Sequence, residues 1–554
     1  MKKLIQYLSC LLSLLLVLTS ATSCSFWKRV MEILNESETK EEESEEPKSY
    51  AAFGREYNLT DEDKAEFLRA LQEALQLMEE GAEESVIDEK IYQIEDLFYH
   101  ISDQADLAYV FFCMDGEDLV ASDQYTYASE MKSDAYYEYM VMCQTVDASD
   151  YPYRAHFFED WTESDFVEMR QYTEEISAIN KKNDELLVEY RALDPDADSF
   201  GAEVSRLYVE MVANNQALAT KFGYPDYVSY AHEMVYERDY SHEELVLLRS
   251  YVQNYLVPLC KSAFDAFYES YQELNPMDQL LISGWLYNDY DDVAGDPVEA
   301  YVASLPESMQ ACMSKVLQEE YAIFTEELTS YEGAFTGYFY EDSYPFCYFG
   351  PGYHSVFTVI HEAGHFWAAD CQGGLDIDLD LAELHSQGNE WLMLEFSKEM
   401  LSRNCYQALR NYKLYESLAT VIVGVIIDEF EEMVYTNASS LDGSLEQLEG
   451  YINEICTRYG GKDFIEEYIT DISTYWKFVV IESPVYYISY SVSAISALAL
   501  YSEATKNYAK AFDIYEALSA GELIPDAFLE NLKKAGLATP FDESVYVAIS
   551  QLIK

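Results

Sequence analysis

The stretch "TVIHEAGHFW", residues 358–367, places two histidines four residues apart, with a glutamate directly after the first. On an α-helix, side chains four residues apart lie on one face, so His361 and His365 are close enough to bind one ion. Zinc suits imidazole nitrogen, and a catalytic zinc site uses three protein ligands and an open position for water. The pattern therefore predicts a zinc-hydrolase centre in which Glu362 takes a proton from that water.

Apolar residues on both sides of the motif indicate a buried helix. "SVFTVI" precedes the first histidine and "FWAA" follows the second. Histidine and glutamate side chains in such a helix need partners, because an unpaired polar group is costly to bury. The alternative, a chance pattern on an exposed helix face, fits these flanks poorly.

The third metal ligand is expected on the next helix, "DLAELHSQGNEWLMLEF", residues 380–396. Glu383 follows His365 by 18 residues, which leaves room for a loop and a returning helix. It shares one helical face with Gln387 and Glu390. We expect Glu383 to complete a site with two histidines and one glutamate. The competing carboxylates lie in or near the connecting loop: Asp376, Asp378 and Asp380.

From about residue 49 onward, the sequence pattern is helical nearly throughout. Residues 61–81 open with acidic side chains, carry apolar residues at three-four spacing, and close on Gly81. The best strand candidate is "GYFYEDSYPFCYFG", residues 337–350, directly before the zinc motif. We predict an all-α fold with this small β-rich patch, divided into an N-terminal helical region (51–200) and a catalytic region (201–554).

The charge balance excludes one class of partner. The chain has 34 Lys and Arg against 102 Asp and Glu, a formal net charge of −68. Such a surface repels phosphate backbones, so we expect no nucleic-acid partner. Eight of the ten cysteines follow Cys24 and form no C-x-x-C pair, so we expect them to be free and buried.

The N-terminus reads as an export signal. "MKK" is followed by the apolar run "LLSLLLVL" (residues 11–18), and "SATSC" then ends at Cys24 like a lipoprotein signal. We predict a signal peptide over residues 1–23 and an acidic tether with a lipid-anchored cysteine over 24–50. The domain would then sit on the outer face of the bacterial cytoplasmic membrane. The alternative is an ordinary secretory signal and a secreted protein.

Several segments together resemble the thimet oligopeptidase and oligoendopeptidase F family of zinc peptidases, most closely the oligoendopeptidase F branch. The similarity spans roughly residues 200–545. Its segments are "NNQALATKFGYPDYVSY" (214–230), "VFTVIHEAGH" (356–365), "ELHSQGNE" (383–390), "PVYYISY" (484–490) and "LKKAGLATPFD" (532–542).

The resemblance implies one zinc ion, held by His361, His365 and Glu383. It also implies that Glu362, directly after the first histidine, is the general base. It also implies that Tyr490 and Tyr487 donate hydrogen bonds to the oxyanion. The expected protein is a monomeric endopeptidase or oligopeptidase for short peptides, with two helical lobes that enclose a deep substrate channel.

One departure favours a second hypothesis. Many family members carry a histidine shortly before the tyrosines, whereas "WKFVVIESPVYY", residues 476–487, has none. The alternative to an active enzyme is therefore a catalytically decayed, peptide-binding lipoprotein on the same scaffold.

Overall fold

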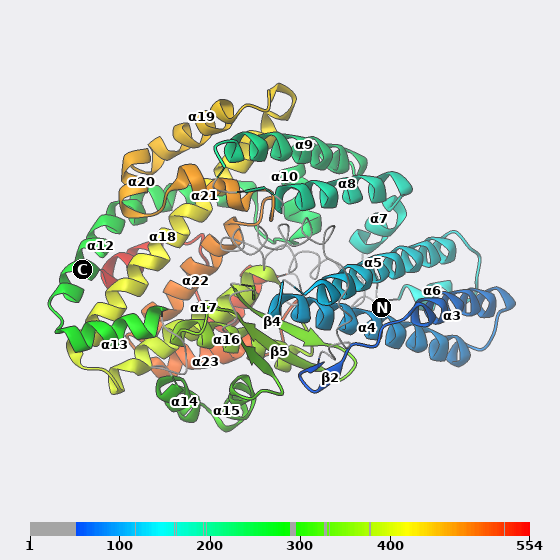
Figure 1. Cartoon of the computed structure of the whole chain (residues 1–554), viewed down its shortest axis with the longest axis horizontal. Coiled ribbons are helices and arrows are strands. Elements are labelled where there is room, and N and C mark those ends of the chain that lie inside the picture. Colours follow the sequence, from blue (N-terminus) through cyan, green and yellow to red (C-terminus); the bar gives the residue numbers. More distant parts are fainter. Residues whose placement is uncertain are drawn as a thin grey trace, which may run out of the picture.

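The computed structural model describes residues 51–553, except 117, 160, 162, 192, 195–196, 288–294, 326–329, 332, 376–377 and 526. The predicted signal peptide (1–23) and the whole predicted tether with Cys24 (24–50) lie outside the described residues. Helices dominate the rest and strands form only two small sheets, which confirms the predicted all-α fold (Figure 1). The boundary at residue 200 and the enclosed channel stay predictions.

In the N-terminal part, residues 59–169 form a helical group with a core of its own, to the right in Figure 1, whereas the last helix of this part packs into the main core of the chain. The chain leaves α3 at Gly81, whose φ of 67° lies in the left-handed region, as the sequence predicted. The elements are β1 (Ala51–Ala52), β2 (Arg55–Glu56), α3 (Asp61–Glu80), α4 (Glu84–Met114), α5 (Leu119–Asp147), α6 (Arg154–Phe157), α7 (Glu163–Gln171) and α8 (Glu174–Arg191).

The next part, also helical, leads to the strands. Two short π-helical segments, η2 and η3, interrupt it. The elements are α9 (Phe200–Lys221), α10 (Tyr227–Tyr230), η2 (Ala231–Val235), α11 (His242–Tyr251), η3 (Val252–Leu256), α12 (Val257–Gln272), α13 (Pro276–Tyr287), α14 (Gly295–Ser304), α15 (Glu307–Met313) and η5 (Ser314–Leu317).

The predicted β-rich patch is part of a three-stranded sheet of order β3-β5-β4. Strands β4 (Ala334–Phe339) and β5 (Tyr344–Phe349) pair antiparallel, with Thr336 opposite Cys347. The sequence did not indicate β3 (Ala322–Phe324), which pairs parallel to β5. Strands β4 and β5 both contact the helix that carries the H-E-x-x-H motif, so the sheet supports that helix from one side.

The C-terminal part supplies the helices around the motif. In Figure 1, α16, α17 and α22 lie toward the centre, and α17 packs against α16, α22 and α23. The elements are α16 (Val356–Gln372), α17 (Leu379–Phe396), η6 (Ser397–Glu399), α18 (Arg403–Thr436), η7 (Ala438–Ser440), α19 (Leu445–Cys456), η8 (Thr457–Tyr459), α20 (Lys462–Tyr468), α21 (Ile472–Val479), α22 (Ile488–Ala504), α23 (Tyr508–Ser519), α24 (Phe528–Ala535) and α25 (Glu543–Leu552).

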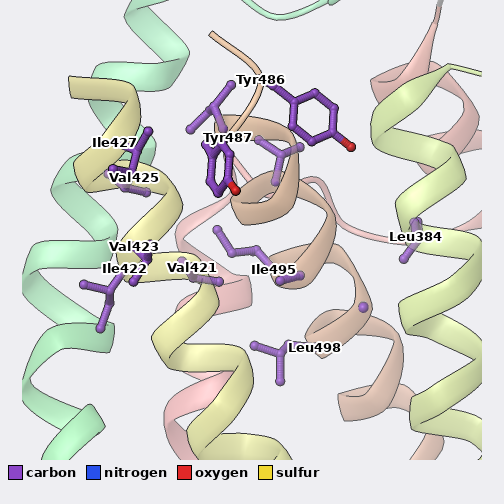
Figure 2. Packing of buried hydrophobic residues seen from close by; sticks show 14 of the residues in the cluster. Leu384, Val421, Ile422, Val423, Val425, Ile427, Tyr486, Tyr487, Ile495 and Leu498 are labelled. Carbon is purple, nitrogen blue, oxygen red and sulfur yellow. The ribbon is translucent and has the colours of Figure 1, made fainter. Parts of the chain in front are cut away.

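Two glycines allow helix backbones to approach closely at the centre. A Cβ atom on Gly364 would lie 2.6 Å from the backbone oxygen of His385, so α16 and α17 meet at this position. A Cβ atom on Gly424 would lie 2.3 Å from the Ser491 hydroxyl, where α18 meets α22. Figure 2 shows apolar side chains, among them Val421, filling the space between those two helices. Side chains on these helices are therefore held at fixed separations.

The eight cysteines after Cys24 are free, and all but Cys371 are buried, close to the prediction. Within the described part of the chain, no helix combines the length and apolar character that a membrane span needs.

Candidate active site

Helix α16 carries both histidines of the motif on the face turned toward α17. The Ser355 side chain caps its start by accepting a hydrogen bond from the Thr358 amide, 3.2 Å away. Gly373, with a φ of 74°, ends it. The rings of His361 and His365 have centroids 5.1 Å apart and planes at 73°, so the two imidazoles lie next to each other.

Glu383 of α17 joins the two histidines. One ligand atom from each of His361, His365 and Glu383 lies within 4.8 Å of the other two. Glu383 Oε2 is 3.9 Å from Nε2 of His361. The structure thus brings together the three residues that the sequence suggested as metal ligands.

The donor set fits a zinc ion. Glu383 is buried, and its Oε2 atom has no hydrogen-bond partner among the described residues, so a carboxylate oxygen faces the histidines uncompensated. Burial lowers the pKa of His365 well below its usual value, which keeps this imidazole neutral and able to donate a lone pair. Two imidazoles and one carboxylate leave a fourth position open, as catalytic zinc sites require.

Glu390 holds the ring of His361 from behind. Its Oε1 atom lies 2.7 Å from Nδ1 of His361, and Lys413 of α18 donates to Oε2 at 2.6 Å. Burial opposes the charge of Glu390, but Lys413 and His361 lower its pKa to about 2. The Glu390 carboxylate is therefore ionised, and it turns Nε2 of His361 toward Glu383. Carboxylate partners of this kind orient metal-binding histidines and fix their tautomer.

The pKa of His361 reflects the same acidic surroundings. Burial lowers it, but the hydrogen bond to Glu390 and the charges of Glu390, Glu362 and Glu383 raise it to about 9. A metal ion and a proton compete for the same nitrogen lone pair. The acidic cluster that retains a proton on His361 would also favour a divalent cation there.

Glu362 is 5% exposed and lies against strand β4. The Thr336 hydroxyl donates to its Oε2 atom at 2.7 Å. Burial raises the pKa of Glu362 to about 7, although the charge of His361 and the Thr336 hydrogen bond lower it in part. A carboxylate with this pKa can both accept and release a proton near neutral pH.

Three tyrosines lie at the start of α22, on the other side of α17. The Tyr486 hydroxyl donates to Glu383 Oε1 at 3.3 Å, and Figure 2 shows it directed toward α17. Tyr487 directly precedes the helix, with its ring centroid 6.0 Å from that of Tyr475. Tyr490 is half-buried, 5.1 Å from Tyr486 and 5.5 Å from Tyr487 between ring centroids. Tyr486 therefore contacts a suggested metal ligand directly.

A strained turn fixes Tyr486. Val485 has a φ of 64°, a region that β-branched residues rarely adopt, and its amide donates to Glu431 Oε1 at 2.8 Å. The buried Arg238 donates to the carbonyl oxygens of Val485 and Tyr486 at 3.0 and 3.2 Å, and to the Ser489 hydroxyl at 2.9 Å. These contacts, from α18 and from the loop between η2 and α11, hold the turn in place.

Neither Asp378 nor Asp380 belongs to the group of possible metal ligands among the described residues. Asp378 caps α17, accepting from the Leu381 amide at 3.0 Å. Burial raises the pKa of the Asp380 carboxyl group, and the charge of Arg238 lowers it in part. Asp376 lies outside the described residues.

Sequence reasoning did not assign roles to four residues of this site. Glu390 was visible as a neighbour of Glu383 on one helical face, which is a usable signal. Thr336, Lys413 and Tyr486 come from a strand, another helix and a turn, and no local pattern marks them.

Comparison with known proteins gives the fold. No family model and no curated protein matches the chain. A protein assigned as an oligoendopeptidase F has a similar structure, with a TM-score of 0.68 and 18% identity, covering 91% of this chain and 98% of that one. PZ peptidase A with an inhibitor has a TM-score of 0.67, 17% identity, and coverage of 90% and 97%. Oligoendopeptidase F from Enterococcus faecium has a TM-score of 0.59, 14% identity, and coverage of 89% and 97%. The chain therefore has the fold of these peptidases over nearly its whole described length.

Proposed function

We propose that this chain is a zinc-dependent oligopeptidase of the oligoendopeptidase F family, which hydrolyses peptide bonds in short peptides outside the cell. One observation carries the proposal: ligand atoms of His361, His365 and Glu383 converge within 4.8 Å, beside the buried carboxylate of Glu362. This arrangement occurs on a fold shared with oligoendopeptidase F structures. Fold alone would not select a reaction, so the argument rests on the site.

The chemistry that a zinc ion would supply at these three residues is polarisation of the scissile carbonyl and a lower pKa for the attacking water. Glu362 is the general base in this proposal. Burial raises its pKa to about 7 in the metal-free protein, and its carboxylate accepts the proton of the attacking water and then protonates the leaving amine. The Thr336 hydroxyl, 2.7 Å from Oε2, fixes the orientation of that carboxylate.

The tyrosines are proposed to stabilise negative charge on the substrate carbonyl oxygen. Tyr490 is half-buried beside Tyr486, and Tyr487 packs against it. A phenol donates where charge develops, and removal of one such donor typically costs about 2.7–4 kcal/mol of transition-state stabilisation. The hydrogen bond from Tyr486 to Glu383 makes Tyr486 a further candidate, either as a donor or as a residue that positions the metal ligand.

The cellular setting is proposed from the sequence. The apolar run at residues 11–18 and the small residues before Cys24 support export and lipid attachment at that cysteine, with the acidic tether holding a monomeric domain off the membrane. Mass spectrometry of the mature N-terminus tests this. A diacylglyceryl modification on Cys24 is expected, and cleavage at another residue without lipid would contradict it.

A pool of short unstructured peptides, incubated with the zinc-loaded protein and analysed by mass spectrometry, tests the activity. We expect internal cleavage that a zinc chelator stops and added zinc restores. Peptide binding without turnover, by folded protein shown to contain zinc, would favour the decayed peptide-binding lipoprotein instead.

A further inference from the structure

A cavity of about 250 Å³ lies beside the candidate active site, between α18, α21 and the start of α22. Tyr490 lines it, and the ring of Tyr490 lies 5.1 Å from that of Tyr486, which donates to Glu383. Glu416 lines it too, and its carboxylate accepts a hydrogen bond from Lys413. The cavity is therefore joined to the metal ligands along two short chains of contacts.

The size of the cavity suits one side chain. Pockets that hold a whole drug-sized molecule usually measure about 300–1,000 Å³. A cavity of about 250 Å³ next to the reacting groups is smaller than these, and matches the side chain of a single substrate residue.

The lining is aromatic and carries one charge. Five tyrosines line it: Tyr412, Tyr415, Tyr475, Tyr487 and Tyr490. Glu416 is the only charged side chain among the described residues that line the cavity. Aromatic faces attract cations through their quadrupole, and the attraction grows where water is partly excluded.

The charges behind the cavity wall also favour a cation. Lys413 is buried and shared by two carboxylates, those of Glu390 and Glu416. Because Lys413 also pairs with Glu390, it offsets the negative charge of Glu416 only in part. A positively charged ligand group at Glu416 would offset it, whereas a carboxylate there would meet repulsion.

We propose that this cavity is a specificity subsite that binds one ammonium or guanidinium group of the peptide substrate, with Glu416 as the counter-charge. The inference rests on the proposed peptidase function and adds a substrate class to it. A lysine or arginine side chain fits best, because its aliphatic stem lies along ring faces while its head reaches the carboxylate. The peptide N-terminus is the other source of the same chemistry.

The test uses the full-length, zinc-loaded protein and N-acetylated peptides in which one residue is varied, position by position. Lysine is compared with norleucine, and arginine with citrulline. At one position we expect kcat/KM to be higher for the charged peptide than for its neutral partner. Glu416→Gln should reduce this charged-to-neutral ratio of kcat/KM roughly fivefold, the effect of about 1 kcal/mol. The ratio within each variant cancels any general effect of Glu416→Gln on the metal centre. Glu446→Gln, at an exposed position of α19, is the matched control and should leave the ratio unchanged.

A second series compares free and acetylated N-termini on peptides without basic residues. A preference for the free amine that Glu416→Gln removes would support the subsite with the N-terminus as its ligand. The dissociation constants of the same peptide pairs for the Glu362→Gln variant give the charged-to-neutral preference even without hydrolysis. If the peptides are cleaved but the charged-to-neutral ratio of kcat/KM is near one at every position, the proposed subsite is wrong and the proposed peptidase function still holds. A charge preference in binding without any hydrolysis would support the subsite and overturn the peptidase.

Discussion

Glu390 Oε1 lies 2.7 Å from Nδ1 of His361, on the side of the ring away from Glu383. The same carboxylate is paired with Lys413 at 2.6 Å, so its position is set by a buried ion pair. His361 therefore presents Nε2 to the candidate metal site with its ring orientation fixed before any ion binds. This is the relation expected of a carboxylate that supports a metal-binding histidine.

Loss of this support should weaken metal binding. We expect Glu390→Gln to reduce zinc affinity by about 10- to 100-fold, because the amide neither orients nor polarises His361 as a carboxylate does. Competition with a chromophoric chelator measures the affinity. Glu399→Gln, at an exposed position beyond the end of α17, should bind zinc like the unmodified protein. Equal affinities for both variants would mean that Glu390 has only a structural role.

The acidic limb of the pH profile should report Glu362. Burial raises its pKa to about 7 in the metal-free protein, and the positive charge of a bound ion lowers it from there. The base form exists above the pKa, so kcat/KM should fall as the pH drops through a value below about 7. Thr336 lowers this pKa by its hydrogen bond, so Thr336→Val should move the limb to higher pH, by about one unit.

Measurement of kcat/KM against pH for both proteins tests the assignment. Thr457→Val, at an exposed position in η8, serves as the control. Glu362→Gln should lower hydrolysis by about 10²- to 10⁴-fold while bound zinc stays stoichiometric. A limb that moves to lower pH in Thr336→Val, or full activity in Glu362→Gln, would contradict the role of Glu362 as base.

The local patterns of the sequence predicted the helices around the site well. The four-residue spacing of the histidines and the return of Glu383 on the next helix follow from helical periodicity, and both can be read over a few dozen residues. Gly81 marked a helix end because a left-handed residue there favours glycine.

The contacts that complete the site come from distant parts of the chain. Arg238 is 247 residues from Val485, and Lys413 is 23 residues from Glu390 on a different helix. Helix α22 begins at Ile488, directly after Tyr487. The strained turn at Val485 sets that start, and hydrophobic periodicity contains no information on it.

Single hydroxyl deletions should separate the tyrosines. We expect Tyr490→Phe to lower kcat by about 10²- to 10³-fold with little change in KM, because an oxyanion donor acts mainly in the transition state. Tyr487→Phe should have a smaller effect, since its ring packs against Tyr475. Tyr486→Phe should lower zinc affinity as well as kcat, because its hydroxyl contacts Glu383.

Steady-state kinetics and metal titration of each variant provide the measurements, with Tyr268→Phe at a largely exposed position as the control. If Tyr487→Phe lowered kcat more than the other two variants, Tyr487 rather than Tyr490 would be the main oxyanion donor. Unchanged kcat in all three would remove the phenols from the mechanism.

The close contact between α16 and α17 should be essential to the metal site. Gly364→Ala would place a Cβ atom 2.6 Å from the His385 carbonyl oxygen, which belongs to backbone and cannot rotate away. We expect the helices to separate, with a loss of about 1–3 kcal/mol in the free energy of unfolding and weaker zinc binding, because the histidines and Glu383 sit on opposite sides of this contact. Denaturant unfolding of the metal-free protein and zinc titration measure the two effects. Gly450→Ala, on α19 with no atom near the added methyl group, should be neutral or stabilise by up to about 1 kcal/mol. If Gly364→Ala behaved like Gly450→Ala, the distance between α16 and α17 would not be what holds the three candidate ligands together.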